Sequence, residues 1–432
     1  MAAPSSTTAP SPKHIVIVGA GIIGSTSAYY LSRHAGFDPA RDSITLLEAT
    51  EVAGGASGKA GGLLALWAFP ACIVPLSYRL HRELAETHGG DRRWGYRAVD
   101  CAGVECRGRS VTPRARAGRE TGGLLSGGGS EGLRKRSKEA AELLEKAGVP
   151  ADLDWIVPES VVAYEAMGTP ENTAQVHPYL FTTSMAELAE EKGVKIVIGS
   201  AMKILQSASD TGRVEGVEYK DGNEDGSIHT LPATHVVLSA GPWTPSVWKK
   251  VPISGSKAYS VTIRPTRPVS AYAIFTQLEL PRDFDEVRGD VTKRRSKGHA
   301  RLVTPEIYAR PNNEVYACYG FGGEDDLPAR TALVSVEEQR CQDIVDFVGS
   351  ISDELRDGEV TGRQACYLPN VSTGGGPIIG ETNVKGLFIA AGHTCWGIQN
   401  GPGTGKLISE IIWEGSAKSA NISSLNPKKF GF

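Results

Sequence analysis

Residues 15–48 read IVIVGAGIIGSTSAYYLSRHAGFDPARDSITLLE, and this stretch decides the fold. It begins with an apolar run, IVIV, which predicts a buried parallel strand, and the residues after the glycines predict a helix through Leu31. Gly19, Gly21 and Gly24 have the G-x-G-x-x-G spacing. In this motif the first glycine allows a tight turn, the second lets a pyrophosphate approach the backbone, and the third lets the helix pack on the strand.

Glu48, at the end of the next expected strand, adds to this pattern. A carboxylate there can accept a hydrogen bond from a ribose hydroxyl and would repel a 2′-phosphate. The helix N-terminus near Ile22 offers free N–H groups to phosphates, so no basic side chain is required. The stretch therefore predicts a dinucleotide site that disfavours NADP. A glycine turn in an unrelated α/β sheet is the alternative.

The composition is that of a large globular protein. A chain of 432 residues is long enough for two or three domains. Hydrophobic residues make up 40% and charged residues 22%, and the net charge of −3 favours neither nucleic acid nor a membrane surface as a partner. No apolar run reaches the roughly 18 residues that span a bilayer, so no membrane-spanning segment is expected.

The N-terminal residues and the cysteines indicate the compartment. Residues 1–12 are expected to be a disordered tail, because they lack the basic and apolar regions of a signal peptide and the arginines of a transit peptide. The 7 cysteines are scattered without zinc-site spacing. They favour reduced thiols, a cytoplasmic location and no metal site.

Patterns farther along the chain predict the remaining elements. Helices are expected over 75–88, 137–147, 178–191 and 336–351, and strands over 194–198, 213–219, 235–243 and 387–392. Between 261 and 323 apolar and polar residues alternate, which predicts an antiparallel sheet. Residues 89–137 instead combine arginines and glycines without apolar periodicity. We expect a flexible, exposed insertion there rather than a polyanion site.

A second glycine-rich stretch, residues 392–406, reads GHTCWGIQNGPGTGK. It precedes a helix expected at 407–414. We do not expect core packing to account for its glycines. They are expected to let the backbone and a helix N-terminus approach a flat ligand.

This stretch and the N-terminal glycines together resemble the D-amino-acid oxidase and glycine oxidase superfamily of flavoproteins. Residues 56–62 (ASGKAGG), 237–243 (VLSAGPW) and 374–380 (GGGPIIG) are similar to further cofactor-binding elements of that superfamily. The stretches TAQVHPYLFT and GFGGEDDLP are similar to a fungal branch, one member of which is linked to late-endosome-to-Golgi transport.

The resemblance implies FAD as the cofactor and an α/β fold (α+β overall) with two domains. A Rossmann-like FAD-binding domain would be built from the discontinuous segments 13–85, 170–250 and 365–432. An antiparallel-sheet substrate (cap) domain would contain 86–169 and 251–364. The residues that the resemblance assigns to FAD binding are Gly19, Ala20, Gly21, Ile22, Ile23, Gly24, Glu48, Ala49, Ser57, Gly58, Lys59, Gly61, Gly62, Leu63, Met202, Ala240, Gly241, Trp243, Gly376, Pro377, Gly392, His393, Gly397, Ile398 and Gln399.

Two positions bear on the substrate and on the flavin linkage. Amino-acid oxidases of the superfamily hold the substrate carboxylate with an arginine directly before a proline, and the corresponding residue here is Leu368. Lys59, Arg310 or Arg363 would have to supply another cation. The related sarcosine oxidases attach FAD covalently through a cysteine in a similar stretch, which makes Cys366 a candidate for such a link. A buried small side chain is the other interpretation of Cys366.

His393 and Trp396 are the candidate catalytic residues, because the resemblance places them beside the flavin. His393 is either a base or ring partner, or a histidine that only bonds its neighbours. Trp396 either walls the substrate pocket or packs in the core. His177, directly before Pro178, is expected to set the start of a helix. Tyr308, Tyr316 and Arg310 either line the substrate side or fill the core of the sheet.

The resemblance implies an FAD-dependent oxidoreductase, either an oxidase or a dehydrogenase, that acts on CH–NH or CH–NH2 donors. It would oxidise a C–N bond of a small amine or amino/imino acid by hydride transfer to flavin N5. The expected partner is a small-molecule substrate. The alternative is an FAD-binding protein with a mainly non-catalytic role in endosomal trafficking or protein interaction, peripheral to the late endosome.

Overall fold

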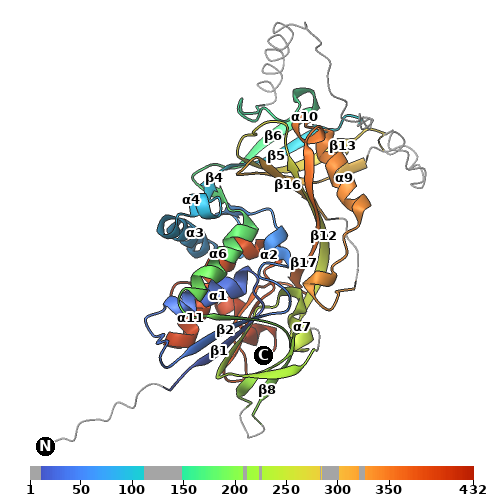
Figure 1. Cartoon of the computed structure of the whole chain (residues 1–432). Helices are drawn as coiled ribbons and strands as arrows, with labels where there is room; N and C mark the ends of the chain where they lie inside the picture. Colours follow the sequence, from blue (N-terminus) through green and yellow to red (C-terminus); the bar gives the residue numbers. More distant parts are fainter. Residues whose placement is uncertain are drawn as a thin grey trace, which may run out of the picture.

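The computed structural model describes residues 11–110, 148–207, 212–222, 226–282, 284, 301–320 and 326–432. These residues form an elongated molecule with two lobes (Figure 1). Strands β12 (Ile253–Arg264) and β17 (Glu359–Val371) pair along their length and run from one lobe into the other. Among the described residues, no helix is long and apolar enough to cross a membrane.

One lobe, called the cofactor lobe here because it contains the glycine motif after β1, has an eight-stranded sheet in the order β10-β9-β8-β2-β1-β11-β19-β18. Its strands are β1 (His14–Val18), β2 (Ser43–Glu48), β8 (Lys195–Gln206), β9 (Val214–Asp221), β10 (Ile228–Pro232), β11 (His235–Leu238), β18 (Ile378–Glu381) and β19 (Leu387–Ala391). The central five, from β8 to β19, are parallel. The chain order reverses at β1, and a crevice for a ligand opens at the carboxyl ends of strands at such a point.

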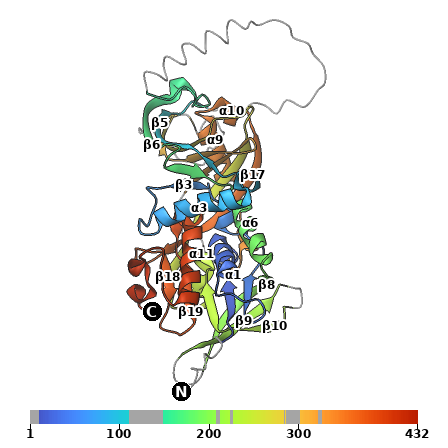
Figure 2. The same cartoon turned by 90° about the vertical axis from the view of Figure 1, so that its left-hand side faces the viewer.

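Helices cover one face of this sheet. Helix α1 (Ile22–Arg33) packs against α6 (Pro178–Glu190) on one side and α11 (Gly397–Glu414) on the other, and α3 (Val74–His88) lies against α11 (Figure 2). The apolar sides of these helices and of β1 and β2 share one buried core. The expected helices at 75–88 and 178–191 and the expected strands at 213–219 and 387–392 are confirmed to within a few residues. The strand expected at 194–198 continues to Gln206, and the one expected at 235–243 ends at Leu238, before a 3-10 turn at Gly241–Trp243.

The start of α11 differs from the prediction, which placed a helix only at 407–414. The helix begins at Gly397 and contains Pro402. A proline has no N–H to donate to the carbonyl four residues earlier, here that of Ile398. The buried His81 on α3 supplies the missing donor, because its Nε2 lies 2.9 Å from the Ile398 oxygen. The helix therefore continues through the proline.

The expectation that core packing does not account for the glycines of 392–406 is wrong for three of them. A Cβ on Gly401 would lie 2.6 Å from Cγ1 of Ile22, and a Cβ on Gly405 would overlap the backbone of Thr26. A Cβ on Gly403 would overlap the Ser77 side chain on α3. These glycines let α11 pack closely against α1 and α3.

The cap lobe contains the second large sheet, in the order β17-β12-β16-β15-β13-β5-β6, with β14 paired to β13. Its further strands are β5 (Asp100–Arg107), β6 (Val161–Gly168), β13 (Tyr272–Leu280), β14 (Arg301–Val303), β15 (Glu306–Arg310) and β16 (Glu314–Tyr319). The pairs are antiparallel except β5 with β13. Helices α9 (Glu338–Gly349) and α10 (Asp353–Arg356) lie on its outer side. The predicted antiparallel sheet is therefore confirmed.

The remaining elements of the described residues are short. A small sheet has the order β3-β7-β4. These elements are α2 (Ala56–Lys59), β3 (Leu63–Ala65), α4 (Gly90–Arg93), β4 (Arg97–Ala98), β7 (Thr173–Gln175) and α7 (Thr244–Val247), with the 3-10 turns η1 (Pro158–Ser160), η2 (Gly241–Trp243), η3 (Thr331–Leu333), η4 (Thr394–Trp396), η5 (Ser423–Leu425) and η6 (Pro427–Phe430).

The predicted flexible insertion from residue 89 is wrong for its first part. Residues 89–110 include α4, β4 and β5, and β5 is an interior strand of the cap sheet. Cys101, Val104 and Cys106 of β5 are buried. The abundance of arginine and glycine concealed this short apolar alternation. Residues 111–137, the expected helix at 137–147 and residues 1–10 of the expected tail lie outside the described residues.

Candidate active site

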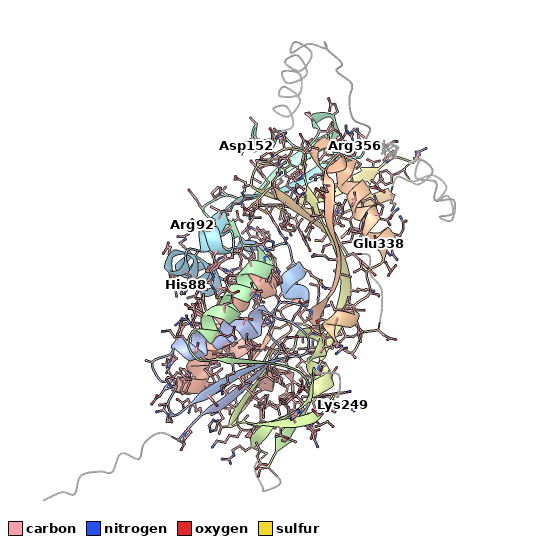
Figure 3. The ribbon with its side chains drawn as sticks, in the orientation of Figure 1. His88, Arg92, Asp152, Lys249, Glu338 and Arg356 are labelled. Atoms are coloured by element: carbon pink, nitrogen blue, oxygen red, sulfur yellow. The ribbon has the colours of Figure 1, made fainter. Side chains whose placement is uncertain are left out.

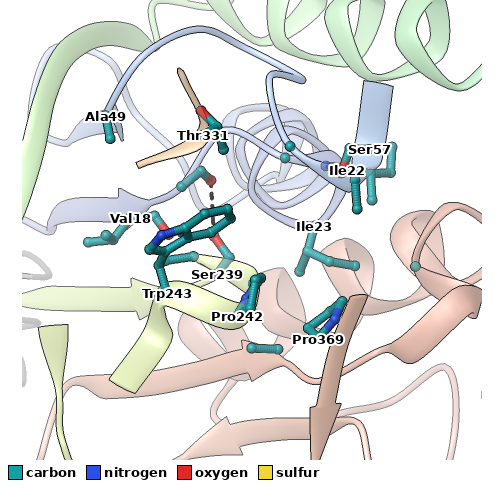
Figure 4. A pocket seen from close by; sticks show the side chains of 18 of the residues that line it. Val18, Ile22, Ile23, Ala49, Ser57, Ser239, Pro242, Trp243, Thr331 and Pro369 are labelled. Carbon is teal, nitrogen blue, oxygen red and sulfur yellow. Dashed lines mark hydrogen bonds between the residues drawn. The ribbon is translucent and has the colours of Figure 1, made fainter. Parts of the chain in front are cut away.

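A pocket opens where the strand order reverses, and it continues from the end of β2 to the start of α11. Figure 4 looks into it, with Ile22 and Ser57 on one side and Trp243, Pro242 and Pro369 around its lower wall. Of the residues predicted to bind FAD, those that line it are Gly19, Gly21, Ile22, Ile23, Glu48, Ala49, Ser57, Ala240, Gly241, Trp243, Gly392, His393, Gly397 and Ile398.

The glycine motif has the predicted geometry. Gly19 has φ +99°, and a Cβ there would lie 2.7 Å from the Ser239 carbonyl oxygen on the neighbouring strand end. A Cβ on Gly24 would overlap the Gly19 oxygen, so Gly24 allows the close packing of helix on strand and does not itself line the pocket. Gly21 faces the pocket, and the N–H of Ile22 donates to Ser57 Oγ at 2.9 Å.

Glu48 is buried at the pocket wall, and backbone groups hold both of its carboxylate oxygens. Oε2 accepts from the Ala20 N–H at 2.8 Å and Oε1 accepts from the Thr50 N–H at 3.0 Å. Burial raises the pKa of this carboxyl, and the hydrogen bonds oppose that rise. Ala20 therefore acts through Glu48 and does not line the pocket.

Several predicted cofactor residues lie outside the pocket wall. They are Ala20, Gly24, Gly58, Lys59, Gly61, Gly62, Leu63, Met202, Gly376, Pro377 and Gln399. Met202 lies at an irregularity in the pairing of β8 with β9, and its side chain is 43% exposed. Residues 199–201 of the same strand line the pocket instead. Gln399 is buried and its Oε1 accepts from the Ala65 N–H at 2.8 Å, so it fixes β3 beside α11.

The three proposed substitutes for the missing arginine are all engaged elsewhere. Arg310 donates to the carbonyls of Ala60 and Gly61 and pairs with Glu314 at 2.9 Å, so it holds the loop after α2. Arg363 pairs at 3.0 Å with Glu338, which Figure 3 shows on α9 at the outer side of the cap.

Lys59 donates from Nζ to the Ala365 oxygen at 3.1 Å. At the position where the superfamily has its arginine, Leu368 lines the pocket together with Pro369. The pocket wall is therefore apolar at the place where an amino-acid oxidase would hold the substrate carboxylate.

The two candidate catalytic residues occupy different surroundings. His393 is buried, its Nε2 lies 2.9 Å from Thr404 Oγ1, and burial lowers its pKa to about 3. The ring is therefore neutral, and it connects the end of β19 to α11 while lining the pocket. Trp396 is partly exposed and meets the Trp67 ring edge-on at 5.6 Å between centroids, and it does not line the pocket.

Cys366 is buried and does not line the pocket, although its neighbour Leu368 on the same face of β17 does. Burial raises the pKa of its thiol to about 11, with a smaller opposing effect of Lys59. Such a thiol is largely protonated at neutral pH and hence a weak nucleophile.

His177 has the role expected for it. It precedes α6, and its Nδ1 accepts from the Leu180 N–H at 3.4 Å, so the side chain caps the helix. Burial lowers its pKa to about 4.

The sequence interpretation missed a cluster of side chains on the cap sheet. Glu306 on β15, Phe275 on β13 and Trp67 after β3 gather with Tyr308 opposite the start of α11. The alternation in EIYAR, residues 306–310, places Glu306 and Tyr308 on one side of their strand. That signal was available, but it does not say which side faces the pocket.

The pocket fits FAD on two structural grounds. Gly19 and Gly21 form a cradle that side chains would fill. The first residues of α1 and of α11 both line the pocket, and neither helix has a cap from its own N-cap side chain, although Ser57 Oγ accepts from the Ile22 N–H. Two helix N-termini at one pocket provide two places for negative charge, which suits a pyrophosphate and the reduced isoalloxazine ring.

Comparisons with known proteins agree with this geometry. The family model described as FAD dependent oxidoreductase matches residues 14–411. The chain is 36% identical to the Saccharomyces cerevisiae protein named "Putative oxidoreductase TDA3", over 97% of this chain and 95% of that one. It is 32% identical to the Schizosaccharomyces pombe protein named "Putative oxidoreductase C1F5.03c", over 96% and 98%. Glycine oxidase from Bacillus cereus has the same fold, with a TM-score of 0.64 and 17% identity over 94% of this chain and 96% of that one.

Proposed function

This chain belongs to the family of FAD-dependent oxidoreductases, and we propose that it oxidises a C–N bond of a small amine or amino/imino acid. The observation that carries the proposal is one continuous pocket that is lined by Glu48, by the first turn of α11 and by Leu368 and Pro369 of the cap sheet. An extended dinucleotide could therefore lie between Glu48 and α11, with a substrate between its ring and the cap sheet. Glycine oxidase, a solved structure with this fold, is named for a small amino acid, and a compound of that class is one of the substrates proposed here.

The residues of the pocket would divide the cofactor among them. The N-terminus of α1, with Gly19 and Gly21, would hold the pyrophosphate, and Glu48 would accept from the ribose hydroxyls. The first N–H groups of α11, at Gly397 and Ile398, would lie at the ring carbonyl that gains negative charge on reduction. Bound FAD supplies the acceptor for two electrons and a hydride.

The remaining residues orient the substrate and exclude water. Leu368 and Pro369 give the pocket an apolar wall, and the Trp396 and Trp67 rings, which contact each other outside that wall, would help to exclude water. A neutral amine needs little acid–base assistance once its C–H bond is oriented towards the acceptor in a dry pocket. The neutral, hydrogen-bonded His393 is therefore proposed to position the start of α11 and not to act as a base.

The test is the absorption spectrum of the purified protein, followed by anaerobic addition of amines, amino acids and imino acids. We expect flavin bands that bleach with at least one small amine or amino/imino acid. A colourless protein that takes up no added FAD would overturn the cofactor assignment. A flavoprotein that no C–N donor reduces would overturn the reaction. The alternative of a mainly non-catalytic role in endosomal trafficking gains no support from the site or the comparisons.

A further inference from the structure

One face of the cap sheet points towards the cofactor pocket. Directly opposed residues in paired strands lie on the same face, and the register pairs Glu306 with Phe275 on one side and with Cys318 on the other. The next strands continue the row through Ser260 and Gln364. On β17 the same face continues from Gln364 through Cys366 to Leu368, and Leu368 lines the pocket.

Glu306 is the acidic member of this face. Its carboxylate accepts hydrogen bonds from the Tyr308 hydroxyl and, at 3.7 Å, from the Cys318 thiol. No Lys or Arg within the described residues contributes to its electrostatic environment, and desolvation raises its pKa. The side chain nevertheless remains partly exposed. An unpaired carboxylate in such surroundings is costly unless a cation can approach it.

Electrostatics and rings connect Glu306 to the cofactor pocket. Cys395 lines that pocket, and its pKa is raised by burial and, to a smaller extent, by the charge of Glu306. Next to Cys395, the Trp396 ring meets Trp67 at 5.6 Å. Trp67 meets Phe275 at 6.2 Å, and Phe275 meets Tyr308 at 6.2 Å. A series of ring contacts therefore joins Trp396, beside the pocket, to Tyr308, whose hydroxyl donates to Glu306.

A carboxylate beside several aromatic faces is an arrangement that attracts organic cations and repels carboxylates. We infer that Glu306, with the rings of Trp67, Phe275 and Tyr308, forms a subsite for the ammonium group of the substrate, and that the substrate is a small amine without an α-carboxylate. This inference rests on the proposed function. The leucine at position 368 agrees with it, because no arginine is needed for such a substrate.

The subsite also explains how the substrate nitrogen would lose a proton. An amine arrives as an ammonium ion, whose nitrogen has no lone pair to support hydride departure. Glu306 receives one N–H proton and becomes a neutral carboxylic acid, which leaves the amine neutral. The neutral nitrogen then has a lone pair that can form the C=N bond of an iminium ion as the adjacent C–H bond breaks. Bound FAD would accept that hydride with its two electrons, so the amine would be oxidised and the cofactor reduced.

The test uses two unreactive probes of similar size on the holoenzyme, benzyltrimethylammonium and benzoate. Their binding is measured by calorimetry and by perturbation of the flavin spectrum. We expect the wild type to bind the cation more tightly than benzoate. In Glu306→Gln, cation affinity should fall by about tenfold, the factor typical of losing one close charge partner. Glu279→Gln is the matched control, because Glu279 lies on the exposed part of β13 beside Arg107, and it should leave binding unchanged.

Tighter binding of benzoate by the wild type, or equal cation affinity in Glu306→Gln and the wild type, would overturn the subsite. Flavin content and melting temperature are measured for each variant. If Glu306→Gln loses FAD, the pH dependence of cation binding by the wild type decides the matter. Amines that reduce the flavin equally in both proteins would overturn the subsite and leave the proposed function standing. Glu306-dependent cation binding without reduction by any amine would overturn the reaction alone.

Discussion

The two sides of the candidate active site differ in the groups that form them: backbone groups on the cofactor side and side chains on the cap side. On the cofactor side, backbone groups face the pocket: the N-termini of α1 and α11 and a glycine turn line it, with the buried carboxylate of Glu48 beside them. On the cap side, side chains define the surface, with Glu306 among aromatic rings. A backbone-built site tolerates few changes of geometry, whereas a side-chain-built site can change specificity by single substitutions.

Gly19→Val should have the largest effect, a loss of FAD binding on the cofactor side. The new side chain would need φ near +99° and would lie against the Ser239 oxygen, so the turn between β1 and α1 would have to move. We expect nearly complete loss of bound FAD, measured as the flavin-to-protein absorbance ratio. Gly320→Ala is the control, because no atom of the described residues, chain neighbours aside, lies within 4 Å of the added Cβ. Full retention of FAD in Gly19→Val would contradict the backbone-built description.

His81→Phe should destabilise the protein through α11. Without the imidazole, the buried Ile398 carbonyl has neither the His81 donor nor the N–H that Pro402 lacks. We expect a loss of about 1–3 kcal/mol in the free energy of unfolding, measured by chemical denaturation. Adding Pro402→Ala restores an N–H four residues after Ile398 and should recover part of that loss. An equal effect of His81→Phe with either residue at 402 would show that the hydrogen bond is not the cause.

Acidification should weaken the binding of a cation on the cap side. Benzyltrimethylammonium keeps its charge at every pH, so its affinity should follow the ionisation of Glu306. The pKa of Glu306 is raised by burial, and affinity should therefore fall as pH drops, by up to about tenfold per pH unit, from above the usual glutamate range.

The other titratable groups facing Glu306 are Tyr308, Cys318, Cys101 and Cys395, whose raised pKa values keep them neutral in acid. A cation affinity independent of pH, measured by calorimetry across the acid range, would argue against Glu306 as the partner.

Cys366→Ser should have the smallest effect. The thiol is buried, protonated and outside the pocket wall, so we expect FAD to be held without a covalent bond. Acid precipitation of the wild type should then release all flavin into the supernatant, and Cys366→Ser should bind the same amount. Yellow protein in the wild-type pellet that disappears in the variant would show a thioether instead.

Features that depend on local sequence were predicted well. The strand, turn and helix around Gly19 and the carboxylate of Glu48 follow from short-range geometry, and the structure has them. The start of α11 could not be predicted, because the donor that accommodates Pro402 comes from His81, far away in the chain.

The cap side was harder for the same reason. Strand β5 was concealed by the arginines and glycines around it. Glu306 becomes a candidate only when the register places it beside Phe275 and Cys318. These relations come from tertiary packing, and no motif in one segment encodes them.

The paired strands β12 and β17 give the molecule a mechanical property. Their outer ends belong to the cap sheet, while Ile253 and Val371 at their other ends pack with Ile378 and Ile389 of the cofactor lobe. Because the two strands are hydrogen-bonded to each other along this length, the pair resists bending and fixes the spacing between the cap sheet and the cofactor sheet. Substitutions on the cap face would then change the surface opposite the pocket without changing that spacing.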